Sequence, residues 1–184
     1  SERRTTAMIA ADLKPWNSAT TLYLARKLDE LSAGADRDRR ALDLGCGDGL
    51  VLEQLHGLGP RLYGCDLPYR EAALRRRLTP LFPDDFADRV RFTPDGRALP
   101  FPDDFFDVVY ANQVFEHVDD LARTLAECAR VLKPDGLLLA LFPPGSYPLE
   151  GHCKVPFAHW PAPGRLRRAW LWPFFAARLR PRRE

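Results

Sequence analysis

The stretch Ala41-Leu42-Asp43-Leu44-Gly45-Cys46-Gly47-Asp48-Gly49-Leu50 decides the fold of this 184-residue chain. The apolar run before Gly45 is typical of a buried strand, and an amphipathic pattern begins directly after Gly49. Glycine permits tight turns and a close backbone approach, and a helix N-terminus presents its first N–H groups to a ligand. The stretch therefore predicts a strand, a ligand-binding turn and a helix, in that order.

The spacing of the glycines narrows the kind of ligand. The turn has the pattern acidic-x-Gly-x-Gly-x-Gly, which differs from the Gly-x-Gly-x-x-Gly of dinucleotide-binding proteins. Asp43, just ahead of the glycines, would repel a phosphate group. The pattern favours a ligand that carries a cationic group, and the alternative is a tight turn that holds no ligand.

Strand and helix patterns alternate on both sides of this turn. We expect strands at 41–44, 61–66, 89–93, 106–111 and 136–142. We expect helices at 18–34, 49–58, 69–78 and 118–132. This order predicts an α/β fold with a doubly wound, mainly parallel sheet, helices on both faces and ligands at the carboxyl ends of the strands.

The pattern becomes irregular after the fifth expected strand. Eight of the 17 prolines lie from Pro143 onward, which indicates loops and short helical pieces, and Pro173 is expected to interrupt any long helix. We expect residues 1–184 to form one domain, with a core at about 36–143 and an irregular substrate-covering segment at 144–184.

Composition limits the class of protein. A hydrophobic fraction of 46% and a charged fraction of 28% are ordinary for a soluble globular domain. The four cysteines are widely spaced and are expected to be reduced core thiols. We find neither a signal-peptide pattern nor an apolar run of the roughly 20 residues that span a bilayer. We therefore expect a soluble, cytoplasmic protein.

Four segments in register resemble the motifs of class I S-adenosylmethionine-dependent methyltransferases, in their small-molecule (type 11-like) branch. The segments are the glycine turn, Gly64-Cys65-Asp66-Leu67, the run from Arg97 to Val109 with its Leu-Pro-Phe, and Val131-Leu132-Lys133-Pro134-Asp135-Gly136. The resemblance covers about residues 40–142, and Asp135 stands where the family has glycine. It implies a Rossmann-like sheet. No pattern for the family's last two strands follows residue 142, so either the fold is abbreviated and these strands are short or missing, or the natural protein continues beyond this sequence.

The resemblance also implies the cofactor and the residues that bind it. S-adenosylmethionine would be the cofactor and S-adenosylhomocysteine its product. Asp43 would help to hold the ammonium group, Asp66 the ribose and Asp95 the adenine amino group, although both Asp66 and Asp95 also suit a simple turn. The implied cofactor-binding set is Asp43, Gly45, Cys46, Gly47, Asp66, Leu67, Asp95, Gly96 and Asn112.

Two histidines are candidates for catalysis. His117 follows the fourth strand, which borders the reaction site in this family, and it can serve as a base or merely cap the next helix. His152 lies in a loop with His159 and is a candidate general base or a surface histidine. No metal site is expected, because the adjacent Glu116 and His117 would point about 100° apart on a helix.

The expected activity is transfer of a methyl group from S-adenosylmethionine to a small molecule, with an oxygen or a nitrogen atom as the expected acceptor. The alternatives are a non-catalytic cofactor-binding or partner subunit with the same fold, and an aminopropyl transferase. Nucleic acid is not an expected partner, because no Asn-Pro-Pro-Tyr motif follows the fourth strand. The segment 165–183 is basic and aromatic. It can contact a membrane surface, and the alternative is a basic end that is only solvated. The oligomeric state is open too.

Overall fold

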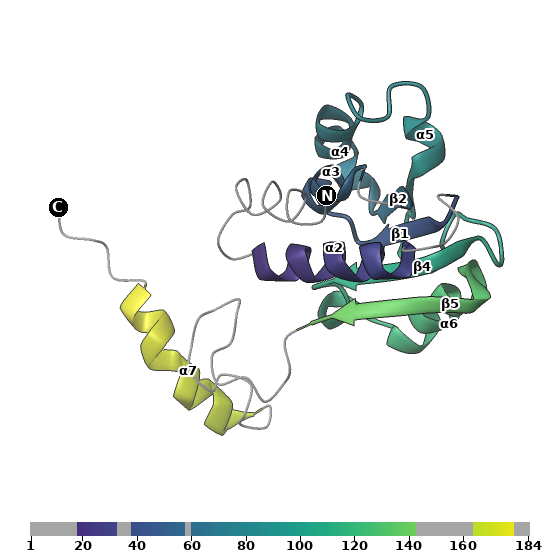
Figure 1. Cartoon of the computed structure of the whole chain (residues 1–184). Coiled ribbons are helices and arrows are strands. Elements are labelled where there is room, and N and C mark those ends of the chain that lie inside the picture. Colours follow the sequence, from purple (N-terminus) through teal and green to yellow (C-terminus); the bar gives the residue numbers. More distant parts are fainter. Residues whose placement is uncertain (1–17, 33–37, 58–59, 143–163, 179–184) are drawn as a thin grey trace. The chain divides into compact units, whose positions relative to one another are not determined.

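A computed structural model describes residues 18–32, 38–57, 60–142 and 164–178. The chain divides into two compact units, residues 1–142 and 143–184. The prediction of a single domain stays a prediction. The elements of the first unit, shown in Figure 1, are α2 (Ser18–Ser32), β1 (Arg40–Leu44), α3 (Leu50–Leu55), β2 (Arg61–Asp66), η1 (Pro68–Arg70), α4 (Glu71–Leu78), α5 (Phe86–Arg89), β3 (Val90–Phe92), β4 (Phe106–Asn112), η2 (Phe115–His117), α6 (Leu121–Val131) and β5 (Leu132–Leu141).

The five strands form one parallel sheet in the order β3-β2-β1-β4-β5. The glycine-turn strand β1 is therefore central, and chain order reverses between β2 and β4 on either side of it. In an open α/β sheet, a ligand binds outside the carboxyl ends of the strands at such a reversal. The predicted fold class is confirmed, and the strands order themselves so that the glycine turn lies at this point.

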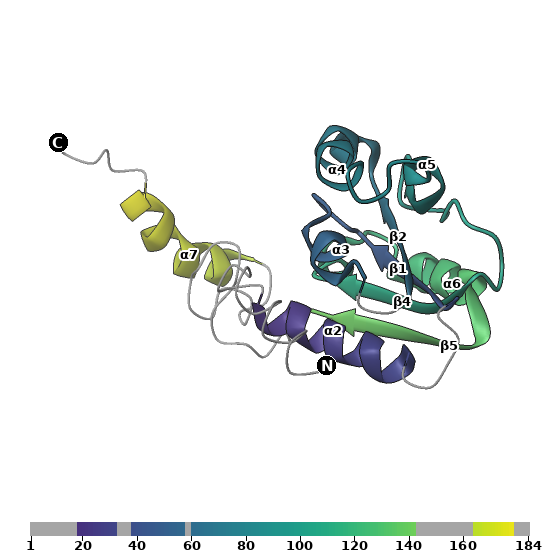
Figure 2. The same ribbon diagram turned by 45° about the horizontal axis from the view of Figure 1, so that its top comes forward.

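Two hydrophobic cores cover the two faces of the sheet. One face packs against α2, α3, α4 and α5, with Leu24, Leu52 and Leu74 among its buried residues. The other packs against α6 and the segment before β4, with Phe101 and Cys128 buried there. Figure 2 shows α3 and α4 on one side of β1 and α6 on the other. The alternation of buried side chains along β1 links both cores.

The element boundaries differ from the predictions at several places. The helix expected from residue 118 begins at Leu121, because the 3₁₀ turn η2 precedes it and Asp120 is its N-cap. A further short helix, α5, precedes β3 and was not predicted. The Lys133–Gly136 turn lies within β5, where the register with β4 shifts: Phe106 pairs with Leu132, but Val108 pairs with Leu137.

The described part of the second unit is one helix, α7 (Arg165–Arg178). The expectation that Pro173 interrupts a long helix was wrong, since α7 continues through this residue. Proline's fixed φ is close to the helical value, so the helix can continue through it at the cost of a backbone hydrogen bond. Within the described residues, no helix is long and apolar enough to cross a bilayer.

Candidate cofactor-binding site

The glycine turn links β1 to β2 through its backbone. The N–H groups of Gly45 and Cys46 both donate to the carbonyl of Cys65, at 2.8 and 3.2 Å. Gly45, Gly47 and Gly49 have φ values of +70°, +61° and +81°, in the left-handed region that side chains disfavour. The three alternating glycines of the sequence are thus required by a backbone that turns sharply between strand and helix.

Asp66 joins the end of β2 to the same turn. Its Oδ2 accepts a hydrogen bond from the N–H of Gly47 at 2.6 Å, and its Oδ1 accepts one from the N–H of Leu67 at 2.7 Å. Each carboxylate oxygen can accept a second hydrogen bond. Asp66 is therefore fixed in place by two backbone donors while it keeps the capacity to bind two hydroxyl groups.

A cavity of about 1100 Å³ opens at the carboxyl ends of the strands. That volume is above the usual range for a small-molecule site, so it accommodates a cofactor with room beside it. Its lining includes seven residues of the sequence-predicted sites: Gly45, Gly47, Asp66, Leu67, Asp95, Gly96 and His117. The fold thus brings together segments that lie up to about seventy residues apart in the chain, at the place the strand order predicts.

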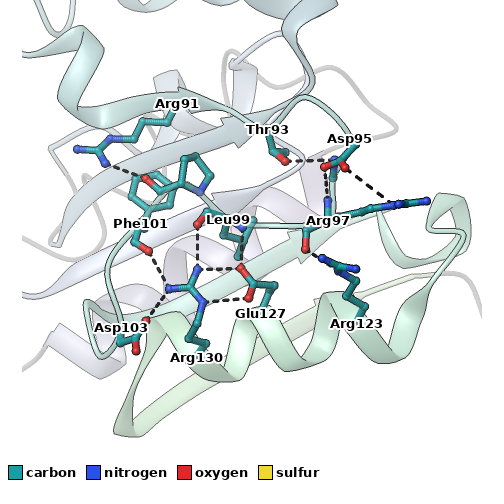
Figure 3. Close-up of polar contacts among 12 residues, drawn as sticks. Arg91, Thr93, Asp95, Arg97, Leu99, Phe101, Asp103, Arg123, Glu127 and Arg130 are labelled. Carbon is teal, nitrogen blue, oxygen red and sulfur yellow. Dashed lines mark hydrogen bonds and ion pairs between the residues drawn. The ribbon is translucent and has the colours of Figure 1, made fainter.

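One wall of the cavity is the segment that carries Asp95, Gly96 and the Leu-Pro-Phe run. Thr93 Oγ1 accepts from the N–H of Gly96 at 3.1 Å, and Asp95 Oδ1 accepts from the N–H of Arg97 at 3.0 Å. These bonds, visible in Figure 3, form a compact turn between β3 and β4. Asp95 is thereby held at the cavity as a turn former, which is compatible with its predicted contact to a ligand.

The same wall is tied to α6 by Arg130 and Glu127 (Figure 3). Glu127 accepts the N–H of Leu99 at 2.8 Å. Arg130 donates to the carbonyls of Leu99 and Phe101, both at 2.9 Å, and forms an ion pair with Asp103 at 2.7 Å. Sequence reasoning missed this arrangement, because a helical Glu-x-x-Arg pair reads as an ordinary surface ion pair.

Three predicted cofactor residues are not on the cavity wall. Asp43 is 2% exposed and Cys46 is 6% exposed, so the side chains of both are buried. Burial, and secondarily the charge of Asp66, raises the pKa of Asp43 well above its usual value. Asn112, at the end of β4, has a buried Oδ1 without a hydrogen-bond partner among the described residues.

The segment after β4 supplies residues that the sequence analysis did not single out. Gln113 lines the cavity with φ +59°, and its N–H donates to the carbonyl of Leu141 at 2.7 Å. A left-handed glutamine stores strain that is common at functional sites.

Three further residues that the sequence analysis did not single out line the cavity from other elements: Tyr69 and Arg70 from η1, and Arg123 from α6. Only their places beside predicted motif residues could have drawn attention to them.

His117 is the last residue of η2, and its N–H donates to the carbonyl of Val114 at 2.9 Å. The residue lines the cavity with its neighbours Val118 and Asp119. The 3₁₀ turn thus places His117 at the cavity wall. His152 and His159 lie outside the described residues, so the structure describes neither. Within the described ranges, no cluster of three or more His, Cys, Asp or Glu side chains could hold a metal ion.

Fold and site together define a doubly wound α/β domain with a ligand cavity at the carboxyl ends of its strands, and comparison with known proteins gives the family. A family profile described as a methyltransferase domain matches residues 42–140. A ubiquinone biosynthesis O-methyltransferase of Yersinia enterocolitica is 31% identical over 128 residues, 70% of this chain and 51% of the relative. The protein of the same name in Bradyrhizobium diazoefficiens is 36% identical over 104 residues, 54% of this chain and 38% of the relative.

A solved structure extends the comparison to three dimensions. It is a Galdieria sulphuraria protein provisionally described as a sarcosine dimethylglycine methyltransferase, with 25% identity and a TM-score of 0.55. The match covers 66% of this chain and 46% of that one. This chain therefore belongs to the methyltransferase-domain family, the class I small-molecule methyltransferases that use S-adenosylmethionine. It spans about half the length, or less, of the relatives named here.

The residues of the site fit this cofactor. Asp66 offers two fixed carboxylate oxygens at the cavity, as a ribose requires. The unpartnered buried oxygens Asp43 Oδ2 and Asn112 Oδ1 are acceptors near the carboxyl ends of the adjacent strands β1 and β4, as an ammonium group requires. This set of hydrogen-bond acceptors is therefore suited to a nucleoside that is joined to an amino acid.

Proposed function

We propose that this chain transfers a methyl group from S-adenosylmethionine to a small-molecule acceptor. The proposed acceptor atom is an oxygen, and the alternative is a nitrogen. The observation that carries the proposal is Asp66, fixed at the cavity by the N–H groups of Gly47 and Leu67. Relatives named ubiquinone biosynthesis O-methyltransferase support an oxygen acceptor. The acceptor itself is a proposal, because the chain spans only part of those relatives.

The chain's residues have distinct roles in this proposal. Asp66 accepts from the ribose hydroxyls and Leu67 packs beside the adenine, while Asp95, next to Gly96, accepts from its amino group. Gly45 and Gly47 leave room for the methionine portion, whose ammonium group binds Asp43 and Asn112. The side chain of Cys46, within the turn, packs in the hydrophobic core. The cofactor supplies an activated sulfonium methyl group, so orientation and removal of one proton remain for the protein.

His117 is the proposed general base that removes the proton of the acceptor. Its position on the cavity wall after β4 supports this, because a general base must reach the proton it removes. His152 is kept as a second candidate base from the sequence. If His117 is the base, replacing it with glutamine should lower the rate of transfer by about 10²- to 10⁴-fold and leave cofactor affinity nearly unchanged.

Calorimetric titration with S-adenosylhomocysteine tests the cofactor site. We expect micromolar binding by the 184-residue chain and loss of binding in Asp66→Ala. Asp84→Ala is the matched control, because Asp84 is exposed and is not part of the cavity lining. Thermal melts of both variants establish that they fold. No binding by the intact chain, or equal binding by Asp66→Ala, would contradict the proposal.

Transfer of a labelled methyl group to a panel of phenols and amines tests the reaction class. Label in phenols supports O-methylation, and label in amines supports N-methylation. Tight cofactor binding without transfer to any acceptor favours a non-catalytic binding subunit. Turnover only with decarboxylated S-adenosylmethionine favours the aminopropyl transferase. Either of these last results would replace the proposed activity.

We also propose that α7 contacts an anionic membrane surface. Its sequence holds four arginines and no acidic residue. The side chains of Leu166 and Trp172 are 82% and 71% exposed, and Arg168 lies one helical turn before Trp172. Exposed apolar and aromatic side chains beside arginines are typical of helices that lie at a lipid interface. Cytoplasmic localisation is compatible with such contact and stays a prediction.

Co-sedimentation with vesicles tests this contact. The chain should bind phosphatidylglycerol vesicles, bind phosphatidylcholine vesicles less, and dissociate as salt is raised. Arg165→Glu with Arg168→Glu should abolish binding. Arg26→Glu with Arg76→Glu, two exposed positions on α2 and α4, carries the same charge change and should retain it. Equal loss in both pairs, or binding of nucleic acid in place of vesicles, would overturn the proposal.

A further inference from the structure

Asp43 is a buried carboxyl group with an unused oxygen. The residue is 2% exposed, one position before the end of β1, and its Oδ2 has no hydrogen-bond partner among the described residues. A charged carboxylate is rarely left in such a place without a partner, because burial removes its hydration. Burial therefore favours the uncharged form of the Asp43 carboxyl.

The sheet places two different neighbours beside Asp43. In the parallel register, Asp43 lies opposite Gly64 of β2 and opposite Tyr110 of β4. Gly64 adds no side chain, and a Cβ there would lie 2.7 Å from Leu52 Cδ1 and 3.0 Å from Cys46 Sγ. Tyr110 is fully buried, and its hydroxyl also lacks a hydrogen-bond partner among the described residues. The tyrosine hydroxyl is therefore the polar group that β4 offers to the Asp43 carboxyl.

The charges around Asp43 act in one direction. Burial and then the carboxylate of Asp66 raise its pKa, whereas hydrogen bonding from Tyr110 lowers it. Burial is the largest cause of the raised pKa of the Cys46 thiol and of the Tyr110 hydroxyl, and the charged form of Asp43 raises both pKa values further. No cation is among the groups that shift these pKa values. The Tyr110 hydroxyl is near the carboxyl group, although neither it nor Asp43 Oδ2 has a hydrogen-bond partner of normal geometry among the described residues.

We propose that binding of the cofactor's ammonium group drives a proton off Asp43, and that Tyr110 is the positioning residue that then donates a hydrogen bond to the carboxylate. This inference rests on the proposed function and names a coupling within the same site. The O–H bond of the neutral carboxyl breaks, its proton goes to the buffer, and no electron is transferred. The ammonium group supplies the positive charge that the buried site lacks.

The sign of the pH dependence follows from the direction of the shift. Below the raised pKa of Asp43, binding has to expel a proton, so affinity falls as pH falls. Above that pKa the carboxylate is already formed, and affinity becomes independent of this group. The other titratable groups near the carboxyl, which are Asp66, Cys46 and Tyr110, do not reverse this sign, because none of them is cationic.

Titration calorimetry in two buffers of different ionisation enthalpy measures the proton. With S-adenosylhomocysteine, the intact chain should release up to about one proton per ligand in the pH range below the raised pKa. The matched ligand is 5′-methylthioadenosine, which retains the adenosine and sulfur but has no ammonium group. It should bind more weakly and release no proton.

Three variants assign the proton to its source. Asp43→Asn should bind S-adenosylhomocysteine about tenfold more weakly and release no proton. Tyr110→Phe should still release the proton but bind more weakly. The pH above which release stops should be higher than in the intact chain, because the hydrogen bond that lowers the pKa of Asp43 is lost. His117→Gln should release as much as the intact chain. Asp43→Asn removes a buried acid that resists charging, so its melting temperature should not fall at pH 8.

The outcomes separate the coupling from the proposed function. Binding without proton release at any pH from 5 to 8, or unchanged release in Asp43→Asn, overturns the coupling and leaves the cofactor site standing. Loss of release in His117→Gln assigns the proton to the histidine and overturns the coupling too. An absence of heat with both ligands in the intact chain removes the proposed function, and the coupling with it.

Discussion

At the scale of single residues, Gly45 is the position where the site tolerates no side chain. Its φ is +70°, and a Cβ would lie 2.6 Å from Cγ2 of Val114. Gly45→Ala should therefore lower the free energy of unfolding by about 3 kcal/mol, from backbone strain and from overpacking together. Denaturant unfolding measures this change. The same variant should lose S-adenosylhomocysteine binding, since Val114 also lines the cavity.

A substitution at Gly57 separates the contribution of backbone strain from that of overpacking. Its φ is +84°, but no atom lies within 4 Å of the position a Cβ would take. Gly57→Ala should cost about 1 kcal/mol from strain alone and leave cofactor binding intact. Equal destabilisation by both variants would show that the contact with Val114 is not a source of the effect at Gly45.

At the scale of elements, Glu127 ties the cavity wall to α6. Hydrogen bonding from Arg130 lowers the pKa of Glu127 from its ordinary 4.5 to about 2. A lowered pKa stabilises the folded state above pH 4.5, and this stabilisation disappears as pH falls toward 2. Its side chain is 20% exposed, so we expect Glu127→Gln to lower the free energy of unfolding by about 1–2 kcal/mol at pH 7.

Urea unfolding of both proteins at several pH values checks this expectation. The difference between the intact chain and Glu127→Gln should shrink between pH 4.5 and 2. Glu71→Gln is the matched control, because its ion pair with Arg75 is more exposed, at 43% and 54%. It should change stability by less than about 0.5 kcal/mol. A difference for Glu127→Gln that does not depend on pH would argue against the ion pair as its cause.

The start of α6 depends on its N-cap. Asp120 accepts a hydrogen bond from the N–H of Arg123 at 3.0 Å, and helix N-termini leave such donors unsatisfied otherwise. Asp120→Ala should lower the free energy of unfolding by about 1 kcal/mol. Asp119→Ala is the comparison, because Asp119 also lines the cavity but does not cap the helix. Thermal unfolding of the two variants should differ; equal melting temperatures would refute the cap assignment.

The sequence predicted the main elements because their signals are local. The five strands and the helices between them follow from runs and periods of apolar residues. The late start of α6 and the helical path through Pro173 were mispredicted, because both depend on backbone geometry that the residue types permit but do not require. The short helix α5 escaped prediction for the same reason: four residues carry no period.

At the scale of the whole molecule, ligand binding should stabilise the fold. A ligand at a hundred times its dissociation constant adds about 2.7 kcal/mol to the free energy of unfolding. For a chain of this size, saturating S-adenosylhomocysteine should raise the melting temperature by about 5–10 °C. Differential scanning fluorimetry measures the shift. Asp66→Ala should show no shift, and a shift of the same size in that variant would contradict its place in the site.

The sequence by itself determined the order of the elements, the glycine turn and the family to which the chain belongs, because motif spacing and hydrophobic period are properties of neighbouring residues. Only the tertiary structure decided which acids face the cavity. Asp66 is the last residue of β2 and Asp43 the last but one of β1, yet Asp66 is fixed at the cavity and Asp43 is buried opposite Tyr110. Strand register and helix packing set that difference, and both arise from contacts between residues far apart in the chain.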